Sequence, residues 1–141
     1  MADEPKVGVG ALIIQNNRIL LTQRHGAHGA GSYGSVGGHL EFGESPQEAL
    51  IREAREELGV ALGNLTFLVC ANLVMYGRHY LDLGFRADII SGRPEIQPAE
   101  RDRIISVAWY DLDDLPQPLF EPIKIYLAAV SSGQPFYHRR I

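Results

Sequence analysis

A short helix with clear start and stop signals follows a glycine-rich segment, and this pair of features constrains the fold most. Ser45-Pro46-Gln47-Glu48 reads as a capping box with proline at the first helical position. Good helix formers continue to Leu58, and Gly59 is placed to end the helix. The segment 26–38 holds six glycines and predicts a loop whose backbone can approach a ligand closely.

Apolar, β-rich runs flank this loop and helix on both sides. Residues 7–14, the Asn16-Asn17 pair and residues 18–24 predict a β-hairpin, because asparagine tolerates the positive φ of a two-residue turn. Two further strands are expected over 65–75 and 79–90, with a turn at Gly77-Arg78. The remaining expected elements are a polar loop over 94–103, a strand over 104–110, a loop over 111–118 and a helix over 119–130.

The order of these elements, ββ-loop-α-ββ-β-α, predicts an α+β domain with a mixed sheet between two helices. The 141 residues correspond to one domain, so we expect a single domain over 1–141.

Composition argues against several classes of protein. Thirteen Lys and Arg against seventeen Asp and Glu leave a formal charge of −4, which disfavours a nucleic-acid polymer as partner. We expect a cytoplasmic protein without membrane contact, because no basic-plus-apolar leader and no stretch near ~18 apolar residues is present. The single Cys70 lies in an apolar run and predicts an inert buried thiol. No His/Cys spacing suits zinc.

The charge is concentrated on the predicted helix, because six of the ten glutamates fall between Glu41 and Glu57. Glu53, Glu56 and Glu57 share one sector of a helix, beside its apolar face. Carboxylates crowded there repel one another and lose solvation, and a divalent cation relieves both costs. Oxygen ligands alone favour Mg²⁺ or Mn²⁺. The alternative is a solvated helix face with Glu/Arg pairs such as Arg52–Glu56.

The spacing around the helix resembles the Nudix box, the motif of the Nudix hydrolase superfamily. Its defined positions are matched by Gly38, Glu44, Arg52, Glu53, Ala54, Glu56, Glu57, Gly59 and Val60. The resemblance implies an α/β/α sandwich with the box as a catalytic loop-helix-loop. It also implies a divalent-metal-dependent hydrolase that cuts a phosphoanhydride bond in a nucleoside diphosphate linked to another group.

The resemblance further assigns roles to the residues of the box. The implied metal ligands are Glu53, Glu56, Glu57 and the carbonyl of Gly38. Arg52 would orient Glu44 behind them. Either Glu57 or Glu100, from the loop over 94–103, would act as the general base, and an exposed loop acid is the alternative for Glu100.

Within the superfamily the chain looks like the MutT-like nucleotide triphosphate diphosphatases, the branch that includes Nudix type 15. Arg24 suits a phosphate through its guanidinium, with a surface salt bridge as the alternative. Gly37 and His39, inside and beside the glycine pair, are expected to approach the phosphates. Phe120 stands roughly where an asparagine would favour oxidised guanine, and it is a candidate to stack on a base instead, as are Tyr33 and Tyr76.

Three functions follow from these expectations. The first is hydrolysis of a (d)NTP to a (d)NMP and pyrophosphate, with Mg²⁺ or Mn²⁺ as cofactor. The second keeps the fold and acts on ADP-ribose or another nucleoside diphosphate sugar. The third is a nucleotide sensor without catalysis, which the complete set of glutamates disfavours. In each case the partner is a small nucleotide, and family habit favours a homodimer.

Overall fold

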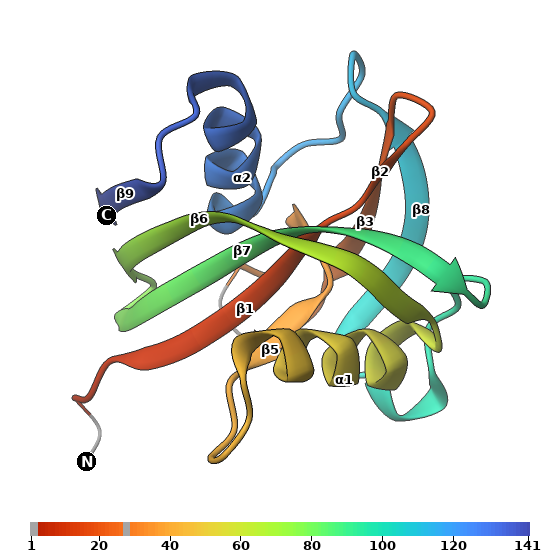
Figure 1. Ribbon diagram of the computed structural model, residues 1–141, viewed down its shortest axis with the longest axis horizontal. Coiled ribbons are helices and arrows are strands. Elements are labelled where there is room, and N and C mark those ends of the chain that lie inside the picture. Colours follow the sequence, from red (N-terminus) through yellow and green to blue (C-terminus); the bar gives the residue numbers. More distant parts are fainter. Residues whose placement is uncertain (1–2, 27–28) are drawn as a thin grey trace.

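Two β-sheets with helices on either side of the larger one build the molecule (Figure 1), and the computed structural model describes residues 3–26 and 29–141. The strands are β1 (Lys6–Leu12), β2 (Ile14–Gln15), β3 (Arg18–Arg24), β4 (Tyr33–Gly34), β5 (Gly37–His39), β6 (Ala61–Met75), β7 (Arg78–Ser91), β8 (Ile104–Asp111) and β9 (Phe136–Arg140). The helices are α1 (Pro46–Leu58), α2 (Glu121–Ser132) and the 3₁₀ turn η1 (Pro98–Glu100).

The larger sheet is mixed and has the order β5-β1-β7-β6-β9. β1 runs parallel to β7 and antiparallel to β5, so Gly8 lies between Asp82 and His39. Because alternate residues of a strand point to opposite faces, β1 contributes to two cores. Val9 packs with α1 on one face, and Leu12 packs with α2 on the other. The predicted α/β/α sandwich with a mixed sheet is confirmed.

The predicted first hairpin is wrong in most of its first strand, as the smaller sheet shows. Only the short β2 turns back onto β3, through Asn16 and Asn17 at φ of 54° and 62°. The rest of the run 7–14 is β1 and joins the larger sheet, because both of its faces are apolar and only there can α1 and α2 cover them. β3 pairs instead with β4 and β8.

Helix α1 matches its prediction residue for residue. Ser45 accepts a hydrogen bond from the Glu48 amide at 3.1 Å, and the Glu48 carboxylate accepts one from the Ser45 amide at 2.8 Å. Gly59 ends the helix in the left-handed conformation at φ 69°. The buried face of α1 consists of Ala49, Leu50, Ala54 and Leu58. The carboxylates of the Nudix-like motif are therefore fixed relative to the sheet.

Other boundaries differ from the expectations. The segment 26–38 is not wholly a loop, since β4 and the start of β5 lie inside it. The turn between β6 and β7 lies at Tyr76-Gly77, both with positive φ, one residue earlier than predicted. Strand β9 was not predicted and adds parallel to β6. Cys70 is only partly buried, with a pKa raised by desolvation. Neither α1 nor α2 combines the length and apolarity needed to cross a membrane.

Candidate active site

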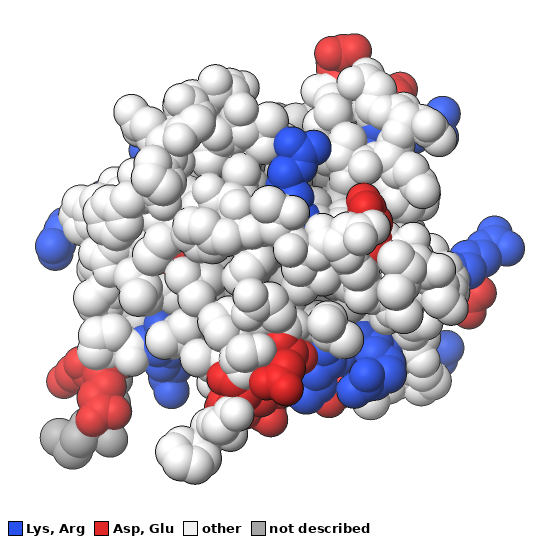
Figure 2. Space-filling view, viewed as in Figure 1, with Lys and Arg blue, Asp and Glu red and all other residues white. Residues whose placement is uncertain are grey.

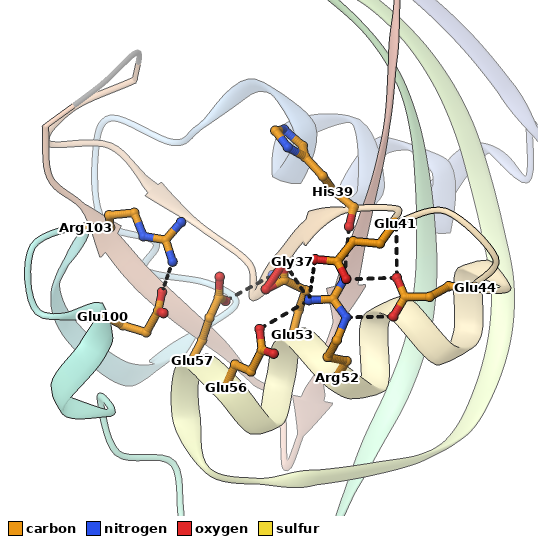
Figure 3. Close-up of polar contacts among 10 residues, drawn as sticks. All are labelled: Gly37, His39, Glu41, Glu44, Arg52, Glu53, Glu56, Glu57, Glu100 and Arg103. Atoms are coloured by element: carbon orange, nitrogen blue, oxygen red, sulfur yellow. Dashed lines mark hydrogen bonds and ion pairs between the residues drawn. The ribbon is translucent and has the colours of Figure 1, made fainter.

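The carboxylates of α1 lie against the edge strand β5, where two glycines make room for them (Figure 3). A Cβ at Gly38 would overlap the carboxylate of Glu53. The amide of Gly37 donates a hydrogen bond to Oε1 of Glu57 at 3.3 Å. The strand therefore brings two backbone groups and two acidic side chains into one small region, as the motif predicts.

Burial makes two of these acids hard to ionise. The pKa of Glu53 is raised to about 6, mainly by burial, although Arg52 counteracts part of that effect. Burial raises the pKa of Glu57 to about 8, and repulsion from Glu53 adds to it. Glu56 is different, because half of its side chain is exposed (51%). The solvated-face interpretation thus describes Glu56 but not its two neighbours.

Arg52 ties the loop before α1 to the helix. Its Nε and Nη2 donate to the two carboxylate oxygens of Glu44 at 2.6 and 3.0 Å, which is a bidentate pair. Nη2 also donates to the carbonyl of His39 at 3.1 Å, and Nη1 donates to Glu56 at 3.2 Å. The hydrogen bonds between Arg52 and Glu44 lower the pKa of Glu44 and raise the pKa of Arg52. In Figure 2 acidic and basic side chains meet along the lower edge, over α1 and the loop before it.

Glu100 joins the site from a different part of the chain. The η1 turn is held to the end of α1, where the Gln97 amide donates to the carbonyl of Glu57 at 2.9 Å. Glu100 is 7% exposed and accepts a hydrogen bond from Arg103, so it is not an exposed loop acid. Its charge contributes to the raised pKa of Glu57. Sequence reasoning missed Arg103, although its i+3 spacing from Glu100 was a usable signal.

The arrangement fits a hard divalent cation by its chemistry. Glu53 and Glu57 are oxygen donors whose shared burial and repulsion a bound cation would relieve. Within residues 3–26 and 29–141, no three acidic, histidine or cysteine side chains already converge in the pattern of a metal site. The hydrogen bonds of Glu57 to Gly37 and of Glu56 to Arg52 hold these carboxylates apart.

The candidate substrate residues fall into two groups around the acidic edge, the region where Glu53 and Glu57 lie against β5. The Arg24 guanidinium lies over the ring of Phe120, 4.0 Å from its centroid, and Phe120 stacks on Tyr76 at 5.8 Å. The Nε of Arg24 is buried and has no hydrogen-bond partner in the described chain. Desolvation lowers the pKa of Arg24, and the charge of Glu57 opposes that shift. Arg24 thus connects the acidic edge with an aromatic surface, and it makes no surface salt bridge with a described residue.

His39 belongs to the second group. Its carbonyl faces Arg52, whereas its imidazole points away from the carboxylates in Figure 3. The imidazole stacks on Tyr80 of β7 at 5.6 Å, and desolvation lowers its pKa. Sequence reasoning did not identify Tyr80, or the buried pair formed by Asp82 and Tyr126 beyond it. No motif marks these residues, since strand register alone brings them together.

The fold and the acidic edge define a hydrolase built as an α/β/α sandwich around a loop-helix-loop. The sequence matches the profile of the NUDIX domain over residues 4–129, and the chain belongs to this hydrolase family.

Solved structures and curated proteins agree with this assignment. The crystal structure of a MutT NUDIX hydrolase from Burkholderia pseudomallei is 38% identical, with a TM-score of 0.86, and covers 91% of this chain and 99% of its own. NAD-capped RNA hydrolase NudC from Pseudomonas aeruginosa (strain LESB58) is 38% identical over 105 residues, which are 74% of this chain and 36% of that protein. An oxidized purine nucleoside triphosphate hydrolase from Danio rerio is 32% identical over 111 residues, 74% of this chain and 65% of that protein. The chain thus spans between about a third and two thirds of these two curated relatives.

Proposed function

We propose that this hydrolase cleaves a phosphoanhydride bond of nucleoside triphosphates, giving a nucleoside monophosphate and pyrophosphate with Mg²⁺ or Mn²⁺. The observation that carries the proposal is the pair Glu53 and Glu57, two partly buried carboxylates with raised pKa values at an edge lined by the backbone of Gly37 and Gly38. A polyphosphate and these acids can approach one another only with cations between them.

We assign the metal to side chains of α1 and to the strand beside it. The proposed ligands are Glu53, Glu56, Glu57 and the Gly38 carbonyl. When bound, the cation would neutralise phosphate charge and acidify a water. Arg52 and Glu44 act behind the ligands, because their bidentate pair fixes the loop before α1 and Arg52 also donates to the carbonyl of His39, next to Gly38.

A general base must take the proton of the attacking water. Glu57 and Glu100 are both candidates, since Glu57 is partly buried, Glu100 is buried, and the charge of Glu100 acts on Glu57. We favour Glu57, because it lies on α1 beside the other proposed ligands, whereas Glu100 is paired with Arg103. Arg24 would bind a phosphate with the N–H groups of its half-buried guanidinium, and the Gly37 backbone and His39 would lie along the phosphates. Phe120 lies beneath the Arg24 guanidinium and stacks on Tyr76, and it forms part of the aromatic surface beside which a base would bind.

The test of the proposed function compares nucleoside triphosphates with other nucleotide substrates. ADP-ribose and other nucleoside diphosphate sugars are the alternative within the same fold. The names of the relatives add NAD-capped RNA and oxidised purine triphosphates. A screen with Mg²⁺ and with Mn²⁺ should therefore include the four NTPs and dNTPs, oxidised dGTP, ADP-ribose, NAD⁺ and a NAD-capped RNA, with products separated by chromatography. Pyrophosphate and a nucleoside monophosphate are the expected products.

Glu56→Gln tests whether the acidic helix carries the reaction. We expect weaker Mn²⁺ binding in an electron paramagnetic resonance titration and lower turnover. Asp114→Asn is the matched control, because Asp114 is an exposed carboxylate in the loop after β8. If Glu56→Gln kept both metal affinity and turnover, the catalytic proposal would fail and a sensor would be the better explanation. Size-exclusion chromatography with light scattering would test the expected homodimer.

A further inference from the structure

A buried carboxylate lies on the face of the large sheet opposite α1, among three buried glycines. Asp82 lies on β7, paired with Gly8 of β1, and the neighbouring pair two residues on is Gly10 with Gly84. These residues share one face, because strand residues two apart point the same way. Asp82 is 9% exposed, and a Cβ at Gly8 would lie 3.1 Å from its Oδ1. Any side chain at position 8 would therefore crowd that oxygen.

Tyr126 of α2 holds the other oxygen of the same carboxylate. Its hydroxyl donates to Oδ2 of Asp82, and a Cβ at Gly10 or Gly84 would overlap its ring. Within the described residues this is the one hydrogen bond to the Asp82 carboxylate. The two oxygens therefore differ, since Oδ2 is engaged by α2 while Oδ1 faces the space above Gly8.

This face continues directly into the candidate active site. Gly8 pairs with His39 on its other side, and the His39 ring stacks on Tyr80, which lies two residues before Asp82. Arg24 interacts electrostatically with both Tyr80 and Glu57. Asp82 is two strands away from β5, or about 10 Å at the usual strand spacing. A Cβ at Gly8 would meet only Oδ1 of Asp82 and the carbonyl of Gly38, so the base of a nucleotide with its phosphates at the β5 edge would have this position within reach.

We propose that Asp82 is a specificity-determining residue that accepts a hydrogen bond, through Oδ1, from an exocyclic amino group of the substrate base. The inference rests on the proposed nucleotide hydrolysis and adds the class of base to it. A carboxylate only accepts hydrogen bonds, so it pairs with an amino group and repels a carbonyl oxygen. Burial raises the pKa of Asp82 to about 6, so the group is ionised at pH 8.

Pairs of nucleotides that differ by one amino group test the proposal. We would compare kcat/KM at pH 8 for GTP with ITP, for ATP with purine riboside triphosphate, and for CTP with its 4-deamino analogue. In the wild type, at least one aminated member should be preferred by roughly 10- to 100-fold, the range expected for a hydrogen bond to a charged group. The Kd values of the corresponding monophosphates, measured by calorimetry in EDTA, should show the same preference without metal.

Asp82→Asn should abolish that preference while keeping the size of the side chain. Tyr126 would donate to the amide oxygen, which leaves the amide NH₂ facing the base, where a donor meets a donor. Asp88→Asn is the matched control, because Asp88 is an exposed aspartate on the same strand that accepts from Asn64 at 3.0 Å. A merely structural role for Asp82 would lower both members of a pair equally and leave their ratio unchanged.

The outcomes separate this inference from the function on which it rests. Suppose the wild type turns over nucleotides, but kcat/KM differs by less than about threefold within every pair. That difference is smaller than one hydrogen bond provides, and only the inference about Asp82 is then overturned. A preference that survives in Asp82→Asn overturns it as well. If the wild type turns over no nucleotide, the proposed function fails and the inference falls with it. The wild-type ratios can overturn the inference even if Asp82→Asn does not fold.

Discussion

Replacing Asp82 by asparagine should change how the stability of the protein depends on pH. Burial raises the pKa of the Asp82 carboxyl from its ordinary 3.8 to about 6, against the lowering effect of the Tyr126 hydrogen bond. The folded state therefore holds the proton more tightly than the unfolded state. The stability that this proton provides is present below pH 3.8 and is lost as the pH rises through about 6.

The size of the effect follows from the two pKa values of Asp82. A difference of about two units corresponds to about 3 kcal/mol of unfolding free energy. The asparagine variant does not titrate, so it should gain about 2.5 kcal/mol on the wild type between pH 4 and pH 7.5. For a chain of this length the gain corresponds to roughly 10 °C in Tm.

Urea unfolding followed by circular dichroism at several pH values would measure this difference. Titration of the other acids, Glu53 and Glu57 among them, is common to both proteins and cancels. Tyr126→Phe provides the contrast, because loss of its hydroxyl should raise the pKa of Asp82 further and steepen the pH dependence. A difference between wild type and Asp82→Asn that stays constant from pH 4 to pH 7.5 would refute the reasoning.

Three further substitutions probe the acidic edge and α1. Arg52→Lys keeps the charge but cannot form both bonds to Glu44, so kcat should fall roughly 10- to 100-fold; an unchanged kcat in a steady-state assay would contradict this. Gly38→Ala should displace Glu53 and weaken Mn²⁺ binding at least roughly 10-fold by calorimetry, whereas wild-type affinity would argue against Glu53 as a ligand. Ser45→Ala removes the N-cap and should cost about 1 kcal/mol, or roughly 3 °C in a thermal melt.

Local signals explain what the sequence could predict. Both ends of α1 are specified by residues in contact with the helix itself, at Ser45 and Gly59, so its boundaries agree with the structure. Arg52 and Glu44 are eight positions apart, so both belong to the same short sequence motif. The carboxylate edge was therefore predictable in its residues, and also in its relation to the glycines of β5.

Non-local pairing explains what the sequence could not predict. The hydrogen bond between Tyr126 and Asp82 joins residues 44 positions apart, and it depends on β1 lying parallel to β7. The same parallel pairing removes β1 from the expected hairpin. The burial of Glu100 depends on the bond from Gln97 to the carbonyl of Glu57, which no periodicity indicates. In each case the missing information is strand register or loop docking, and neither leaves a pattern in a single sequence.

Strand β5 connects the two halves of the proposed site, and this explains why two of its three residues are glycine. Gly37 donates to Glu57 and has no space for a side chain against β1, while Gly38 makes room for Glu53 on the α1 side. His39 places its ring on the opposite face, in the row that leads to Asp82. Chemistry at the edge and selectivity over the sheet therefore share only three backbone positions. It follows that a substitution at position 82 should change which base is preferred without altering the carboxylates, whereas a side chain at position 37 or 38 would disturb the carboxylate edge itself.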